Sequence, residues 1–83
     1  MGNTETIYVA LLDEPAGTWR PVQAAPRAGG LYFILSKNDD PESEAWQFPS
    51  GGLVRCETRL LEGRELLLAV ELVAPRGLRL VQE

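Results

Sequence analysis

The sequence predicts an all-β domain of about five to seven short antiparallel strands, closed into a small barrel or stacked as a sandwich. Glycine and proline recur along the whole chain, and the segments between them are strand-like. Apolar and polar residues alternate strictly from Val54 to Leu60, which is the pattern of a half-buried strand. The composition is 45% hydrophobic and 24% charged, as in folded soluble proteins.

The first half of the chain predicts three strands separated by turns. The expected strands cover residues 7–12, 18–24 and 31–35, and the turns cover 13–17 and 26–30. Pro21 cannot donate a backbone hydrogen bond, so the second strand is expected to lie at a sheet edge or to carry a bulge there. Residues 1–83 are predicted to form a single domain, within which the polar residues 1–5 are expected to be a disordered N-terminal tail.

The second half begins with a polar, acidic loop and continues with further strands. We expect the loop at 37–44, a short strand at 46–48, a turn at 49–52, a strand at 54–60 and a reversal at 62–64. Residues 65–73 are short for a helix and follow a hairpin-sized reversal, which favours a strand, although their good helix formers leave a two-turn helix open. A last strand is expected at 78–81, with Leu78 and Leu80 facing inward. The tripeptide Gly-Gly-Leu, which begins at Gly29 and again at Gly51, indicates two similar turns.

Alternation assigns side chains to an inner and an outer face. It places Cys56 on the inner face and Arg55 on the outer face of the strand at 54–60. Trp46 and Phe48 are expected to anchor the short strand inward. The predicted core comprises Ile7, Val9, Leu11, Trp46, Phe48, Val54, Cys56, Leu60, Leu66, Leu68 and Val70.

Composition argues against several kinds of chemistry. The chain has no histidine and a single cysteine, Cys56, so neither an internal disulfide nor a metal site is expected, and no cofactor is predicted. An inward thiol without a histidine neighbour is not an activated nucleophile. The acidic cluster Asp39, Asp40, Glu42 and Glu44 falls in a polar loop, where nothing would desolvate a carboxylate. These observations predict a protein that is not an enzyme.

The expected location is the cytoplasm. An unpaired thiol fits a reducing compartment, and no apolar run approaches the roughly 20 residues of a spanning helix. The first six residues match the loose pattern for N-myristoylation, which is too short to predict lipidation here.

Charge and aromatic content favour binding over catalysis. The net charge of −4 makes nucleic acid an unlikely partner. A domain of 83 residues has only a marginal core, so association with itself or with another protein is the leading hypothesis. The candidate interaction surface is the outer face that carries Arg20, Arg55, Glu57 and Arg59, and Trp19 is counted with them as a binding residue. The alternative is a nucleic-acid-associated barrel that uses the C-terminal arginines Arg55, Arg59, Arg64, Arg76 and Arg79.

Four short motifs in order resemble a group of small uncharacterised bacterial proteins. The motifs are Trp-Arg-Pro-Val at 19–22, Gly-Leu-Tyr at 30–32, Trp-Gln-Phe at 46–48 and Gly-Leu-Val-Arg-Cys-Glu at 52–57, after a strand of the Ile-Tyr-Val-Ala-Leu-Leu type at 7–12. The resemblance covers roughly residues 5–71. It implies an SH3-like β-barrel and no established activity. The group usually has Pro-Gly-x-x-Val at the turn where this chain has Pro-Ser-Gly-Gly-Leu-Val at 49–54, which predicts a longer loop there.

Overall fold

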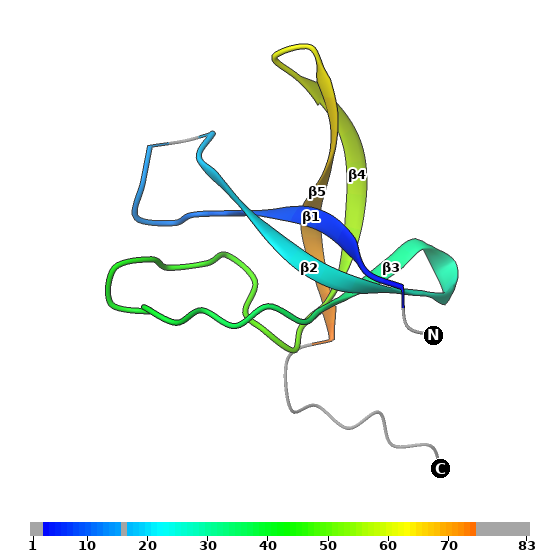
Figure 1. The fold of residues 1–83 in the computed structure, drawn as a ribbon, viewed down its shortest axis with the longest axis horizontal. Helices are drawn as coiled ribbons and strands as arrows, with labels where there is room; N and C mark the ends of the chain where they lie inside the picture. The colour runs from blue at the N-terminus through cyan, green and yellow to red at the C-terminus, as the bar shows by residue number, and fades with distance from the viewer. Residues whose placement is uncertain (1–2, 16, 75–83) are drawn as a thin grey trace.

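The computed structural model describes residues 3–15 and 17–74. The chain forms a closed barrel of five strands, consistent with a small SH3-like barrel, in which each strand pairs with the next along the chain (Figure 1). The elements are β1 (Glu5–Ala10), β2 (Trp19–Arg27), the 3₁₀ turn η1 (Ala28–Gly30), β3 (Leu31–Ile34), β4 (Leu53–Leu61) and β5 (Arg64–Ala74). The all-β prediction is therefore confirmed, and residues 65–73 form a strand.

The closing contact of the barrel is parallel, in contrast to the antiparallel pairing expected throughout. The four sequential pairings are antiparallel, whereas β1 and β5 run in the same direction and share the single bridge Tyr8↔Leu68. The strand number explains this difference. Direction alternates along a meander, so the first and the fifth strand point the same way.

Pro21 lies where the sequence predicted, in a part of β2 with a strand on one side only. β1 pairs with β2 from Trp19 to Ala24, but β3 pairs with β2 only from Ala24 to Arg27. A residue without a backbone donor is tolerated there because no ladder is required on the second side. β1 begins at Glu5, which pairs with Ala24, so Glu5 is not part of the expected N-terminal tail.

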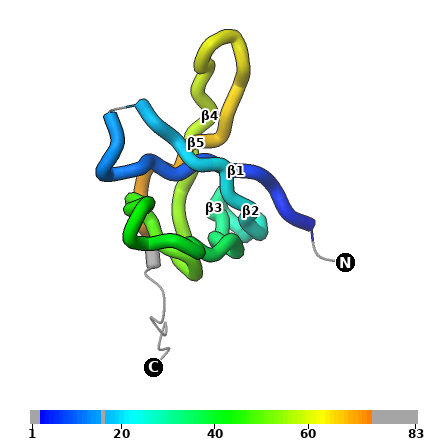
Figure 2. The backbone as a smooth tube through the Cα atoms, turned by 60° about the vertical axis from the view of Figure 1, so that its left-hand side comes forward, coloured from blue at the N-terminus to red at the C-terminus, as the bar shows by residue number. Residues whose placement is uncertain are grey.

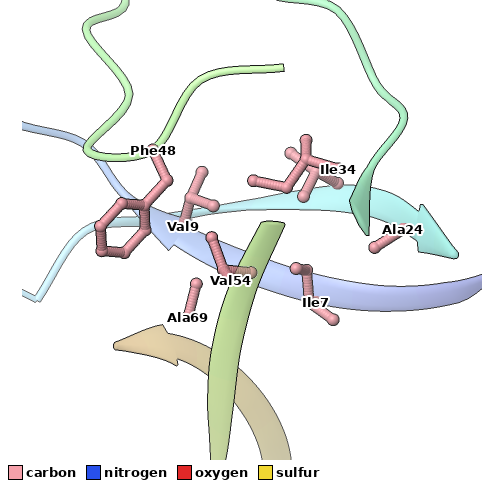
Figure 3. Close-up of a cluster of buried hydrophobic side chains, with 8 residues drawn as sticks. Ile7, Val9, Ala24, Ile34, Phe48, Val54 and Ala69 are labelled. Carbon is pink, nitrogen blue, oxygen red and sulfur yellow. The ribbon is translucent and has the colours of Figure 1, made fainter. Parts of the chain in front are cut away.

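The core lies inside the barrel, where strand side chains and one loop aromatic converge (Figure 3). Ile7 and Val9 point inward from β1, and Phe48 reaches the same interior from the segment between β3 and β4. Ile7, Val9, Phe48 and Val54 confirm the predicted core. Alternation within β2 and β3 also contributes residues that the predicted core omitted, namely Val22, Ala24 and Ile34.

The reversal between β4 and β5 sets which residues of β5 face the core. Glu62 and Gly63 both have positive φ, 51° and 79°, as in a two-residue type I′ turn. The resulting register places Leu67 opposite Thr58 and Ala69 opposite Cys56. Ala69 therefore belongs to the core cluster, and Leu67 packs against it.

Of Leu66, Leu68 and Val70, which were expected in the core, only Leu68 is confirmed as buried, at 3% exposure. Leu68 is buried but lies outside the core cluster, flanked by Tyr8 on one side and Glu57 on the other, and Leu66 and Val70 are only half-buried. Two register shifts in β5 leave Val70 and Val73 without partners on β4. These bulge-like shifts bring Leu72 onto the inner face opposite Val54.

The far end of the β4–β5 hairpin projects beyond the barrel (Figures 1 and 2). Leu60 lies on the inward side of β4 by alternation, yet 69% of it is exposed because no other strand of the described residues covers the hairpin at that point. The prediction of Leu60 as a core residue is therefore wrong. Its face was assigned correctly, but the strand is longer than the barrel is tall.

Other expectations are corrected between β1 and β4. Residues 46–48 do not form a strand: only Trp46 makes an isolated bridge, to Leu11. Leu11 is half-buried outside the core cluster, whereas Trp46 and Cys56 are half-buried and pack against it.

The two Gly-Gly-Leu turns are alike only in their first glycine. Gly29 and Gly51 have φ of 81° and 84°, but Gly30 also has positive φ while Gly52 does not. Gly52 is instead buried, where a Cβ would meet the carbonyl oxygen of Pro49 at 3.1 Å. The strand expected at 78–81, with Leu78 and Leu80, lies outside the described residues, as do Arg76 and Arg79.

The core predicts a large contrast between two aliphatic truncations. Ile34 is fully buried, so Ile34→Ala should lower the free energy of unfolding by about 2–5 kcal/mol. Leu12 is 62% exposed, and Leu12→Ala should change it by no more than about 0.5 kcal/mol. Urea unfolding followed by circular dichroism measures both. Equal losses for the two variants would contradict the described core.

Candidate binding groove

The segment between β3 and β4 covers the part of β2 that β3 leaves unpaired. At its start, the backbone N–H of Leu35 donates to the carbonyl of Gln23 at 2.8 Å, and the N–H of Gln23 donates to Ser36 Oγ at 2.8 Å. At its end, the N–H of Leu12 donates to the carbonyl of Ala45 at 2.7 Å, beside the bridge formed by Trp46. The segment is thus hydrogen-bonded to β2 at its start and to Leu12, which follows β1, at its end.

Asn38 organises the interior of this segment. Its Oδ1 accepts a hydrogen bond from the N–H of Asp40 at 3.0 Å, which is an Asx turn. Its Nδ2 donates to the carbonyl of Glu44 at 2.7 Å. The N–H groups of Ser43 and Glu44 both donate to the carbonyl of Asp40 at 3.0 Å. The acidic loop is therefore an ordered turn, held by one amide side chain.

Glu44 joins the segment to β2 through its carboxylate. Arg20 donates from Nε to Glu44 Oε1 at 3.0 Å and from a terminal nitrogen to Oε2, and Trp46 Nε1 donates to Oε1 at 3.0 Å. We call Arg20, Glu44 and Trp46 the carboxylate cluster. Its guanidinium contact is bidentate, which fixes the orientation of both groups.

Protonation within the carboxylate cluster follows from these contacts. The hydrogen bond from Arg20, followed by that from Trp46, lowers the pKa of Glu44 below its ordinary value of 4.5. The hydrogen bond to Glu44 raises the pKa of Arg20. Both groups carry full charge at neutral pH, so the cluster acts as a fixed ion pair and not as an acid or a base.

Two hollows flank the carboxylate cluster and share its residues Glu44 and Trp46. The first, of about 470 Å³, is lined by the apolar surfaces of Trp46, Ala45, Pro41 and Pro49, together with Lys37, Asn38, Glu44 and Ser50. The second, of about 420 Å³, lies between the segment and β2 and is more polar. Trp46 is thus placed as a wall between an apolar hollow and a polar one. We call the first hollow the tryptophan groove.

The predicted binding face does not form a single surface. Arg55, Glu57 and Arg59 do lie together on the outer face of β4, where Glu57 accepts from Arg55 at 3.2 Å and from Arg59 at 2.6 Å. Arg55 also donates to Glu71 at 2.9 Å. The bonds from Arg59 and then Arg55 lower the pKa of Glu57.

Arg20 was predicted on that outer face, and this is wrong. It pairs with Val9 and alternates with buried Val22, so it lies on the inner side of β2, where it joins Glu44. Trp19, opposite Ala10, is half-buried on the other side of β2. Alternation counted from Val22 would have placed Arg20 correctly, but the pairing with Glu44, 24 residues away, has no signal in the sequence.

The described residues offer little machinery for covalent or metal chemistry. Desolvation raises the pKa of Cys56 to about 11, so the thiol stays protonated at neutral pH. Within residues 3–15 and 17–74, no group of three or more histidine, cysteine, aspartate or glutamate side chains is placed to hold a metal ion. None of the helical turns in that same part of the chain has the length and apolar character needed to cross a membrane.

Comparison of the chain with protein-family models, with curated proteins and with solved structures gives no match.

The carboxylate cluster predicts an acid-sensitive loop. The pKa of Glu44 is lower in the folded than in the unfolded chain, so its stabilising contribution is present above about pH 4.5 and is lost as the pH falls through the lower, folded value. Trp46 fluorescence in a Trp19→Phe background should therefore change in this window. Glu44→Gln carries no charge at this position and should show the acid-like signal already at pH 7. An unchanged signal in Glu44→Gln would contradict the role of the cluster.

Proposed function

We propose that this protein is a non-catalytic protein-binding module, whose tryptophan groove receives an extended segment of a partner. The observation that carries the proposal is a half-buried tryptophan fixed by a charged hydrogen-bond partner beside an open hollow of about 470 Å³. Binding sites are typically concave and mostly apolar, with a few placed polar groups. The tryptophan groove has this composition.

The lining of the groove indicates the kind of segment that it would accept. Trp46, Pro41 and Pro49 present flat apolar surfaces, of the kind that dock extended, proline-containing peptides in aromatic-lined grooves. The carboxylate of Glu44 is already engaged by Arg20, which leaves Lys37 as the cation at the rim. An extended apolar segment with an acidic residue beside it complements these groups.

The resemblance to small bacterial proteins of SH3-like fold bears on the fold and names neither an activity nor a partner. The tryptophan of the Trp-Gln-Phe motif is the residue that forms the groove wall. We further propose a bacterial origin, from that resemblance, and a cytoplasmic location, because an unpaired thiol fits a reducing compartment. Protonated Cys56 and the ion-paired Glu44 offer neither a nucleophile nor a general base, which also favours binding over catalysis.

Selection of peptides from a displayed random library tests the groove. We expect apolar, proline-containing sequences with an acidic residue to bind the native protein, and Lys37→Glu and Ser50→Trp to weaken this binding by roughly tenfold or more, because like charges repel and the added ring fills the hollow. Glu65→Arg lies on β5, away from the groove residues, and should bind as the native protein does. Selected peptides that bind the Lys37→Glu and Ser50→Trp variants unchanged would contradict the proposal.

The nucleic-acid alternative predicts a different outcome, which we do not expect. Arg55 and Arg59 are already paired with Glu57 and Glu71, so the outer face of β4 carries no net positive charge among these four groups. Electrophoretic shift assays with RNA and DNA at low salt should therefore show no complex. A complex that weakens steeply with salt, and that Arg59→Glu abolishes, would favour the alternative.

A further inference from the structure

Among residues 3–15 and 17–74, no strand pairs with the outer half of β4 on the side away from β5. β3 pairs with β4 only from Leu53 to Arg55, whereas the pairing with β5 continues to Leu61. Within the described part of the chain, residues 56–60 therefore pair on the β5 side only. Figures 1 and 2 show this end of the hairpin standing clear of the rest of the barrel.

An exposed edge of this kind is open to pairing with another strand. Natural proteins usually protect such edges with like charges, prolines or bulges. Residues 56–60 contain no proline, and the register shifts of β4 with β5 lie before Cys56. The charges along this edge are of both signs, Glu57 and Arg59, and therefore do not repel every register of a paired strand.

Leu60 adds an uncovered apolar side chain to this edge. It is 69% exposed on the side of β4 that carries Cys56 and Thr58. In the barrel this side faces the core, but at the hairpin end none of the five described strands covers it. A second strand beside β4 would extend the sheet and give Leu60 a neighbour on the same face.

Charge complementarity selects one register for pairing between two copies of β4 among those centred on residues 57, 58 and 59, the positions beyond the pairing with β3. A two-fold axis perpendicular to the sheet keeps each face on the same side, so a residue can lie opposite only residues of the same face. With Glu57 on the axis, Glu57 would face itself and Arg55 would face Arg59. With Arg59 on the axis, two arginines would meet. With Thr58 on the axis, Glu57 of each copy lies opposite Arg59 of the other, and Cys56 lies opposite Leu60.

We propose that a second copy of this chain pairs antiparallel with the free edge of β4, with Thr58 of the two copies facing each other across the two-fold axis. The proposal does not use the tryptophan groove and is independent of the function proposed for it. The result is a continuous sheet in the order β5–β4–β4–β5. Two Glu57–Arg59 pairs lie on one face and two Leu60–Cys56 contacts lie on the other.

Engineered disulfide formation at residue 58 tests this register. Directly opposed residues of an antiparallel pair have Cα atoms about 4.5–5.5 Å apart, which a disulfide spans. In a Cys56→Ala background, Thr58→Cys should form a covalent dimer under mild oxidation roughly tenfold faster than Glu65→Cys, because pairing raises the effective concentration of the two thiols. Glu65 is exposed on the same hairpin but lies on β5, away from the axis. Equal rates for the two thiols would overturn the proposal.

Charge exchange tests the same interface without a covalent bond. Sedimentation equilibrium should show a concentration-dependent dimer for the native chain. Glu57→Arg and Arg59→Glu should each weaken it by roughly tenfold or more, and the double variant should restore it, because opposite charges again face each other. Glu65→Arg makes the same charge change outside the interface and should leave the dimer intact. Circular dichroism confirms that each variant is folded.

The outcomes separate this interface from the groove. A native chain that remains monomeric up to millimolar concentration would overturn the edge pairing while leaving peptide binding at the groove unaffected. A dimer that Glu57→Arg and Arg59→Glu leave unchanged would place the contact elsewhere and would also overturn the proposal. A dimer weakened by Lys37→Glu and not by Glu57→Arg would assign self-association to the tryptophan groove.

Discussion

Closure of the sheet between β1 and β5 is the constraint on which the rest of the structure depends. A meander of five strands must close in parallel, and here the closure is made by one bridge, Tyr8↔Leu68. Leu68 is buried at this seam although it lies outside the core cluster. Such a short seam leaves part of the barrel interior to be covered by something other than a strand. Phe48 and the half-buried Trp46, both from the segment between β3 and β4, provide that cover.

The shortness of β3 explains why the groove lies where it does. β3 is short and leaves half of β2 without a neighbour on one side, so the following segment has to cross that space before β4 begins. Backbone groups at the two ends of the segment form hydrogen bonds with Gln23, Ala10 and Leu12. The carboxylate of Glu44 forms hydrogen bonds with Arg20. The hollows beside Trp46 remain because an irregular segment fills this space less completely than a strand would. The segment between β3 and β4 therefore determines both how the barrel interior is covered and what shape the binding surface has.

Much of the fold could be predicted because alternation and turn residues are local signals. The inner face of β4 and the strand at 65–73 followed from them. The phase of β5 was also encoded: a two-residue reversal at Glu62 and Gly63 puts Leu61 opposite Arg64, and counting from there assigns Leu67 and Ala69 to the core. The shift at Val70 could not be predicted, because a bulge depends on how the strand has to bend around the finished barrel.

The candidate site was less accessible from the sequence. Arg20 and Glu44 lie 24 residues apart, and both belong to common residue types, so nothing local connects them. Leu60 shows a second limit of prediction from the sequence, namely that its face could be assigned but its exposure could not. Alternation assigns it a face, but only the height of the barrel relative to the hairpin determines whether that face is covered.

The Asx turn at Asn38 has an implication for how this protein diversifies. Residues 39–43 are held by Asn38 and by the backbone of Asp40 and Glu44, while the side chains of Asp39, Glu42 and Ser43 are exposed. The shape of this segment thus depends on few of its own side chains. The others are free to vary through substitution without loss of the frame. A rigid barrel that presents such an interchangeable stretch is a natural starting point for grafting new specificities, in the manner of a hypervariable loop on an antibody domain.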